Sequence, residues 1–315
     1  MYIGEFRNFD QAYYALISTV RSSGFVCNPR YNGVCTEMRP ASFVIQNPLQ
    51  ALYTGTERRL NYGFAAVESA MYIADVGSDK NYKSIEDTRI LCRMNSNMLR
   101  FVNQKTKVMD GAYGPRLHDG LARCYKLLKD DMWSRQAVAS IWNNVEKRAG
   151  ETVDVPCTLS LNFFCTQYDD AIAPVLHLSV TMRSNDLNWG TPYDVAAFCH
   201  IQIMMAEALG FNVGKYYHTV GSLHFYDETP PVVVPYESFD HAHGLLDVLE
   251  YKPFVSTWDE VVAAHRGFLD ECFRAYYDSS FTTIVLTDKI GDHECVKRLK
   301  KMMKWSWKRY DQSKQ

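Results

Sequence analysis

Several side chains between residues 156 and 226 are suited to act together on one small anionic ligand. Cys157 follows a proline at the start of an apolar run, and a cysteine near arginines is a candidate nucleophile because nearby cations favour the thiolate. Arg183 stands directly before Ser184, and a guanidinium fork beside a hydroxyl suits a phosphomonoester. The pattern predicts a nucleotide site with a reactive thiol. A small buried cysteine and a structural ion pair remain alternatives.

Other candidates carry carboxylates, an imidazole and a phenol. Asp194 opens an apolar helix, where its default role is that of an N-terminal cap. His224 and Tyr226 alternate to the same face of a predicted strand and could bind a sugar hydroxyl together. Glu68 lies inside a mostly apolar helix, so its carboxyl group is either a structural hydrogen-bond hub or a catalytic acid and base. Arg30, in a turn-rich loop, is a candidate phosphate ligand or a solvated loop arginine.

Composition limits the setting of such a site. The chain of 315 residues, 47% of them hydrophobic, can hold one large domain or a domain with an appendage. A net charge of -2 gives no global reason to expect nucleic acid or an acidic membrane as a partner. Nine cysteines without a C-x-x-C pair, no signal-like N-terminus and no apolar run of about 18 residues predict a soluble protein of the reducing cytoplasm.

The elements that must position these residues alternate between helical and strand periodicity. The first helix should be capped by Asp10. The helix over 194–209 is apolar on nearly every face, which predicts a central, buried position. The last helix is basic, which predicts a solvated charged face over an apolar docking stripe. Helices are predicted at 10–22, 61–75, 86–102, 119–130, 194–209, 258–277 and 295–310, and strands at 134–143, 157–165, 173–183, 214–220 with 222–226 as a pair, and 282–286.

Taken together, the motifs resemble those of the thymidylate synthase family, over roughly residues 8–228. Weaker matches place Glu68 on the family's catalytic glutamate, Tyr113 on its active-site tyrosine and Arg135 on the segment that reaches the partner subunit. Arg30 falls where a phosphate-binding loop arginine is expected. The specific matches are Pro156-Cys157 with the Pro-Cys nucleophile strand, Arg183-Ser184-Asn185-Asp186 with Arg-Ser-x-Asp, Gly190-Thr191-Pro192-Tyr193-Asp194-Val195-Ala196 with Gly-x-Pro-Phe-Asn-Ile-Ala, and Gly221-Ser222-Leu223-His224-Phe225-Tyr226 with Gly-Asp-x-His-x-Tyr.

The resemblance implies an α/β (α+β) fold, with a large mixed β-sheet, flanking helices and a homodimer formed sheet to sheet. It also implies a catalytic domain over 1–250, followed by a mostly helical C-terminal extension over 251–315. The partners implied are a pyrimidine nucleotide and 5,10-methylenetetrahydrofolate as cosubstrate, with no metal.

The implied chemistry assigns a role to each matched residue. The Cys157 thiolate would add to C6 of the pyrimidine, so that C5 attacks the one-carbon unit, while Glu68 manages proton transfers at the ring. The phosphate would be bound by Arg30, Arg183, Ser184 and Arg135 of the other subunit, the sugar by His224 and Tyr226, and the folate side of the site would include Asp186, Tyr113 and Gly190.

Departures from the family pattern point to the base. Thymidylate synthases carry asparagine where this chain has Asp194, and an amide can both accept from uracil N3–H and donate to O4. A carboxylate only accepts, which fits the N4 amino group of cytosine and a protonated N3, and leaves uracil O4 unpaired. Asp194 therefore predicts dCMP as substrate, as in the branch of the family that hydroxymethylates deoxycytidylate, found chiefly in bacterial viruses.

A second departure concerns the product. The family's synthases carry tryptophans just after the helix of Glu68, packed near the folate and the methylene group, and none of this chain's six tryptophans lies there. Water could therefore trap a less sheltered methylene group and give a hydroxymethyl group. Methylation of dCMP, a dUMP-specific enzyme and a catalytically silent nucleotide-binding subunit remain alternatives. A zinc deaminase is excluded because Ser160 occupies the second cysteine position of its P-C-x-x-C signature.

Overall fold

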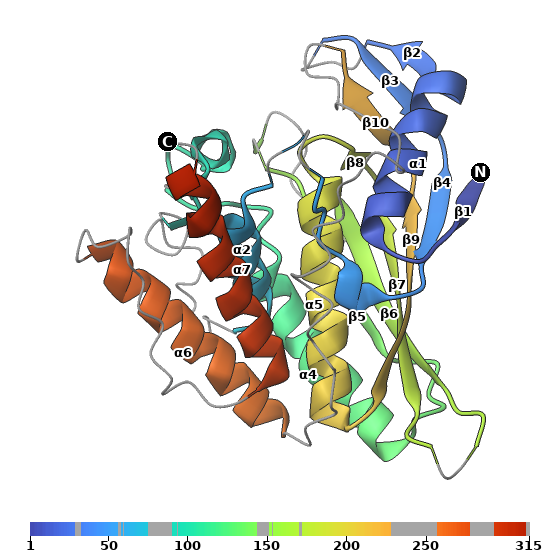
Figure 1. Cartoon of the computed structure of the whole chain (residues 1–315), viewed down its shortest axis with the longest axis vertical. Helices are drawn as coiled ribbons and strands as arrows, with labels where there is room; N and C mark the ends of the chain where they lie inside the picture. Colours follow the sequence, from blue (N-terminus) through green and yellow to red (C-terminus); the bar gives the residue numbers. More distant parts are fainter. Residues whose placement is uncertain are drawn as a thin grey trace.

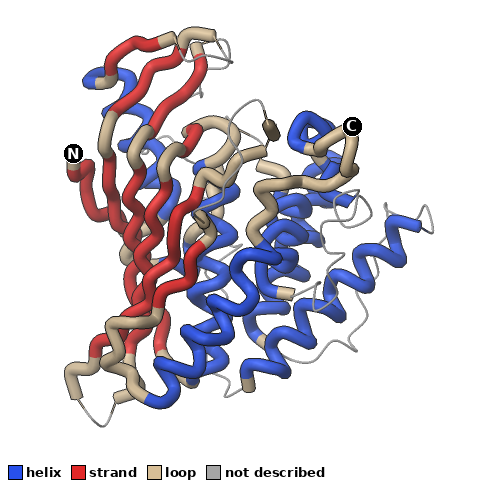
Figure 2. Tube along the Cα trace, turned by 180° about the vertical axis from the view of Figure 1, so that it is seen from behind, coloured by secondary structure: helices blue, strands red, loops and turns tan. Residues whose placement is uncertain are grey.

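The structure is a computed structural model that describes residues 1–28, 33–55, 58, 60–74, 90–92, 94–143, 151–152, 154–169, 172–227, 257–277 and 293–312. Arg30 and the strand expected at 282–286 lie outside the described residues. Figure 1 shows a large sheet on one side of the molecule and a layer of helices on the other, and Figure 2 shows the same layers from behind.

A six-stranded mixed sheet forms one layer. Its strand order is β1-β4-β9-β7-β6-β5, with β1 parallel to β4 and β7 parallel to β9, while the remaining neighbours are antiparallel. The expected mixed sheet is thereby confirmed. The strands are β1 Tyr2–Phe6, β4 Ala41–Ile45, β5 Val138–Ser140, β6 Thr158–Thr166, β7 Val175–Met182 and β9 Asn212–Val220.

The register of three central strands brings distant motifs to one edge of this sheet. Met182 of β7 lies opposite Thr158 of β6 and beside Val220 of β9. The residue before β6 is Cys157, the residue after β7 is Arg183, and the residue after β9 is Gly221. Strand pairing therefore places the candidate nucleophile and the candidate phosphate ligand Arg183 side by side.

A smaller sheet of four strands continues from that edge. Its order is β2-β3-β10-β8, with bounds β2 Phe25–Cys27, β3 Cys35–Met38, β8 Asn185–Asp186 and β10 Leu223–Tyr226. The expected pairing of 214–220 with 222–226 is wrong, because β9 and β10 belong to different sheets. The chain crosses between them at Gly221, where a Cβ atom would stand 2.8 Å from the carbonyl oxygen of Arg183.

The amino-terminal helix begins earlier than its sequence pattern suggests. Helix α1 runs Phe9–Ser23, and its cap is Asn8, whose side chain accepts a hydrogen bond from Gln11 N. Asp10, expected to be the cap, instead accepts from the backbone N and the hydroxyl of Thr54. The correction has a simple cause, since Asn and Asp are equally good caps and only one of them faces the free N–H groups.

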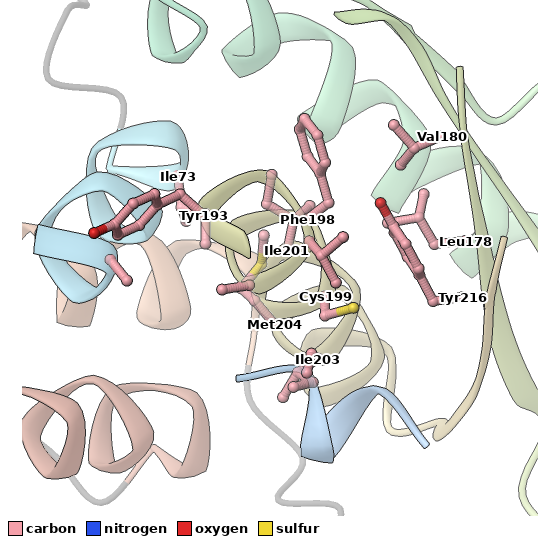
Figure 3. Packing of buried hydrophobic residues seen from close by; sticks show 14 of the residues in the cluster. Ile73, Leu178, Val180, Tyr193, Phe198, Cys199, Ile201, Ile203, Met204 and Tyr216 are labelled. Carbon is pink, nitrogen blue, oxygen red and sulfur yellow. The ribbon is translucent and has the colours of Figure 1, made fainter. Parts of the chain in front are cut away.

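Helix α5, Thr191–Leu209, occupies the centre of the molecule. Its side chains are buried on almost every face, as expected, and Figure 3 shows them packed between the sheet and the neighbouring helix α2. Gly210 ends the helix in the left-handed region with φ 71°. The surrounding elements are η1 Pro48–Gln50, α2 Tyr62–Ile73, η2 Ser96–Phe101 and α4 Gly114–Asp130.

The helix expected over 86–102 is only partly confirmed. Residues 90–92 are helical, but a separate 3-10 helix occupies Ser96–Phe101. Asn95 interrupts the run, because its side chain accepts a hydrogen bond from Asn97 N and starts a new turn.

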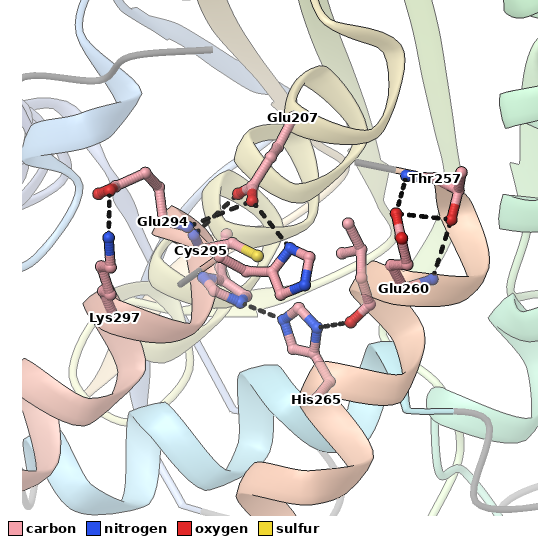
Figure 4. A network of polar contacts seen from close by, with 10 residues as sticks. Glu207, Thr257, Glu260, His265, Glu294, Cys295 and Lys297 are labelled. Atoms are coloured by element: carbon pink, nitrogen blue, oxygen red, sulfur yellow. Dashed lines mark hydrogen bonds and ion pairs between the residues drawn. The ribbon is translucent and has the colours of Figure 1, made fainter. Parts of the chain in front are cut away.

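Two C-terminal helices, α6 Trp258–Tyr277 and α7 Glu294–Gln312, pack against α2 and α5. The carboxylate of Glu207, on α5, accepts from the backbone N of Glu294 and Cys295 and so caps the start of α7 (Figure 4). Arg298, expected on a solvated basic face, is only 2% exposed and donates to Leu49 O at 2.6 Å. No helix in the described ranges is long and apolar enough to span a bilayer.

Candidate active site

Cys157 and Arg183 face each other across the ends of β6 and β7. The backbone N of Arg183 donates to Cys157 O at 2.8 Å, which continues the ladder of the two strands. The guanidinium group folds back over the same loop, with Nε donating to Pro156 O at 2.8 Å and Nη2 donating to Val155 O at 3.0 Å. Nη2 also lies 3.6 Å from Cys157 Sγ. The candidate nucleophile thus has a fixed cation beside it.

Burial and nearby carboxylates together favour the neutral thiol of Cys157 in the free protein. Burial raises the pKa of Cys157 to about 11, although the Arg183 guanidinium acts in the opposite direction. The carboxylates of Asp194, Asp154 and Asp186 add to the increase. If Cys157 acts as a nucleophile, its thiolate has to form when substrate binds, because the thiol is the form favoured in the free protein.

Tyr113 holds the start of β6 in place. Its hydroxyl oxygen accepts from the backbone N of Cys157 at 3.2 Å, and from the N and Oγ1 of Thr158, both at 3.1 Å. Its ring packs against Tyr72 and Phe198, with centroids 5.2 and 6.2 Å away. Besides the folate contact implied by the resemblance, Tyr113 therefore holds the backbone of Cys157, the candidate nucleophile.

Two carboxyl groups, Glu68 on α2 and Asp194 on α5, are close enough to interact electrostatically. Burial raises the pKa of Glu68 to about 8, and the charge of Asp194 adds to this. Burial also raises the pKa of Asp194 to about 7, against the hydrogen bond from Asn185 that lowers it. Both groups consequently exchange protons near neutral pH, as general acids and bases require.

Asp194 is not the cap of its helix. The cap position is Gly190, and Asp194 N donates to Gly190 O as an ordinary helical hydrogen bond. The Asp194 carboxylate accepts instead from Asn185 Nδ2 at 2.7 Å. The capping alternative is thus wrong, and the side chain is held in a defined orientation from a different element.

The expected phosphate and sugar ligands line a cavity of about 410 Å³ at the junction of the two sheets. Arg183, Ser184, His224 and Tyr226 all contribute to its wall. His224 and Tyr226 do share a face, with their rings in an edge-on arrangement 5.3 Å apart. The structure thus brings these four residues to one cavity, and their contacts with phosphate and sugar stay predictions.

The same cavity contains residues that the sequence did not single out. Glu37 is 2% exposed and accepts from Arg39 Nε at 2.8 Å and from the hydroxyl of Ser222. Burial acts to raise the pKa of Glu37, but hydrogen bonds from Cys27, Ser222 and Arg39 hold it below its usual range. Arg39, with 59% of its side chain exposed, adds a cation at the rim. Of these residues, Ser222 alone belongs to a sequence motif, where it stands in place of the aspartate of Gly-Asp-x-His-x-Tyr.

Other expected ligands lie outside the cavity. Arg135 is exposed in the turn before β5 and does not line the wall, which leaves its contact with a second subunit a prediction. Asp186 accepts from the backbone N of Asn188 and Trp189, and so orders the turn that leads to α5. Gly190 occupies the cap position of that helix. None of the described residues forms a cluster suited to a metal ion.

Comparison with known proteins agrees with this arrangement. The model of the family "Thymidylate synthase" matches residues 95–248. A "Deoxyuridylate hydroxymethyltransferase" of Bacillus phage SP01 is 31% identical over 262 residues, which cover 80% of this chain and 66% of the relative. The chain belongs to the thymidylate synthase family. A thymidylate synthase of Streptococcus pyogenes serotype M5 is 26% identical over 144 residues, 45% of this chain and 47% of the relative.

The thymidylate synthase fold extends beyond the matched segment. The thermostable thymidylate synthase A from Bacillus subtilis superposes with a TM-score of 0.55 over 70% of this chain and 81% of that one, at 21% identity. The chain spans about two thirds of the length of the phage relative and about half that of the streptococcal one. The family match ends at residue 248, before α6 and α7.

Proposed function

We propose that the protein transfers a one-carbon unit from 5,10-methylenetetrahydrofolate to C5 of dCMP, and that water completes the product, 5-hydroxymethyl-dCMP. The observation that carries the base assignment is the carboxylate of Asp194, oriented by Asn185 where the family's synthases carry an amide. The cavity lies close to the Cys157 thiol, because Arg183 lines the cavity and its Nη2 lies 3.6 Å from Cys157 Sγ.

The residues of the chain divide the work. Arg183 and Ser184, with Arg30 of the loop and Arg135 of a second copy, bind the phosphate, while His224 and Tyr226 bind the sugar. Cys157 adds to C6, and Glu68, whose pKa is raised to about 8, moves protons at the ring. The folate supplies the one-carbon unit at C5, beside Tyr113, Asp186 and Gly190. In this proposal residues 1–250 are catalytic, 251–315 form a helical extension, and the enzyme works as a homodimer in the cytoplasm of a phage-infected host.

Mass spectrometry of the product tests the reaction. Incubation with dCMP and methylenetetrahydrofolate should add CH2O to the nucleotide, whereas methylation would add CH2 and release dihydrofolate, which absorbs at 340 nm. The Cys157→Ser variant should be inactive, and full activity in it would refute the nucleophile. A chain that binds dCMP but yields neither product would be the silent nucleotide-binding subunit.

A second candidate is hydroxymethylation of dUMP. It is favoured by the phage relative, whose name gives deoxyuridylate as its substrate. Burial also raises the pKa of Asp194 to about 7, and a protonated carboxyl group can donate to uracil O4 much as an amide does. A side-by-side assay of dCMP and dUMP separates the two candidates. Asp194→Asn should shift the preference toward dUMP by at least about tenfold if the carboxylate selects the base.

A further inference from the structure

Asn185 lies between two partners that fix the orientation of its amide. Its Nδ2 donates to Asp194 Oδ2 at 2.7 Å, while its Oδ1 accepts from the hydroxyl of Thr191 at 2.8 Å. The Thr191 hydroxyl is shared with Asp186 O at 3.0 Å. Asn185 and Thr191 are 2% and 0% exposed, so water does not compete for these groups. The result is a short buried chain of hydrogen bonds that ends on one oxygen of Asp194.

The backbone at Gly190 leaves space for the hydrogen bond between Asn185 and Asp194. A Cβ atom at Gly190 would stand 3.1 Å from both Asn185 Nδ2 and Asp194 Oδ2, tighter than nearly all real contacts of that kind. Gly190 has a φ of -92°, which any residue can adopt, so the glycine matters here for the space that it leaves and not for its conformation. The contact between Asn185 and Asp194 is therefore built into the turn that begins α5.

The consequence for Asp194 is chemical. An oxygen that accepts a hydrogen bond from an amide keeps carbonyl character, since the hydroxyl oxygen of a carboxylic acid is the poorer acceptor. When Asp194 carries a proton, the proton therefore resides on Oδ1, which has no hydrogen-bond partner among the described residues. Oδ1 becomes a fixed donor and Oδ2 a fixed acceptor.

Cytosine and uracil need opposite arrangements of this pair. Neutral cytosine requires a donor opposite N3 and an acceptor opposite the N4 amino group, whereas uracil requires an acceptor opposite N3–H and a donor opposite O4. A carboxyl group whose proton can sit on either oxygen satisfies both bases. A carboxyl group whose proton is confined to one oxygen satisfies only one.

We propose that Asn185, oriented by Thr191, is a positioning residue that confines the proton of Asp194 to one oxygen and thereby sets the choice between cytosine and uracil. This inference rests on the proposed function for the identity of the preferred base, but not for the existence of the preference. Asp194 interacts electrostatically with titratable groups from several elements. They are Glu68 and Tyr72 of α2, Tyr113 before α4, Cys157 before β6, Asp186 of β8 and Tyr216 of β9.

The test measures dissociation constants for dCMP and dUMP by calorimetry, together with kcat/KM for each, in four proteins. Thr191→Val removes the hydroxyl that holds the amide, and Thr191→Ser keeps it, so the two form a matched pair of similar size. Asn185→Leu removes the donor itself. We expect Asn185→Leu and Thr191→Val to bring the ratio of the two affinities about tenfold closer to unity, and Thr191→Ser to retain the wild-type ratio.

Repeating the calorimetry in buffers of different ionisation enthalpy counts the protons taken up on binding. In the wild type, proton uptake should accompany the preferred nucleotide, and in Thr191→Val it should accompany both. An unchanged ratio in Thr191→Val and in any folded Asn185→Leu protein would overturn the inference. A wild type that prefers dUMP would refute the proposed function, yet a ratio that moves toward unity in the variants would still support the role of Asn185.

Discussion

Replacing Tyr113 with phenylalanine removes a single oxygen, but that oxygen accepts from three donors. They are the backbone N of Cys157 and the N and Oγ1 of Thr158, at 3.1 to 3.2 Å. A hydroxyl oxygen has two lone pairs, so about two full hydrogen bonds are lost, and each buried donor left unpaired costs about 1–3 kcal/mol. Thr158 is fully buried, which leaves its N–H without access to water. The free energy of unfolding should fall by about 2–6 kcal/mol.

Differential scanning calorimetry provides the measurement. With about 2.1 cal/mol/K of unfolding entropy per residue, a chain of this length should lose about 3–9 °C in Tm. Tyr125→Phe, on the helix α4 that follows Tyr113, is the matched control, because among the described residues its hydroxyl accepts from Lys129 Nζ alone, at the surface, and its Tm should change by less than about 1 °C. The Tyr113 variant should also lose activity through the displaced thiol. A Tm equal to that of the control would refute this account of how β6 is anchored.

Two further predictions concern buried carboxylates. Glu207→Ala removes the cap of α7 and should lower the free energy of unfolding by about 3 kcal/mol, with loss of amide hydrogen-exchange protection in α7 as the readout; protection equal to wild type would contradict the capping role. For Glu68, a folded-state pKa of about 8 means that its contribution to stability is present below pH 4.5 and is lost as the pH rises to 8. Glu68→Gln should therefore unfold at higher temperature than wild type at pH 8.5 but at a similar temperature at pH 5, and parallel pH profiles would contradict this.

Local patterns carried most of the architecture. The periodicity over α5 predicted a central helix, and the structure buries nearly all of it. The pattern over α6 predicted its bounds at Trp258–Tyr277 correctly. Which strands pair with each other was harder to predict from the sequence. The segments 214–220 and 222–226 follow each other in the chain and yet lie in different sheets. Arg298 shows a related limit, since a lysine-rich helix gives no local sign of which cation is buried.

Some residues of the candidate site were likewise predictable from local sequence, and others were not. His224 and Tyr226 are two residues apart in one strand, so their shared face follows from strand geometry. Asn185 occupies the variable position of its motif, and its role depends on where β8 lies relative to the first turn of α5. Glu37 is separated from Ser222 by 185 positions in the chain. Contacts made across a sheet junction have no periodic signal, and the sequence could not reveal them.

Helix α2 has the candidate catalytic Glu68 on one side and the C-terminal helices on another. Arg266 of α6 donates to Ala74 O at the end of α2, and α7 packs along the same helix. Any selection scored on nucleotide turnover would therefore recover inactivating mutations in α6 and α7, far along the chain from every ligand contact. Such a screen would mark the C-terminal helices as necessary for turnover, because they pack against α2 and α5, the helices that carry Glu68 and Asp194.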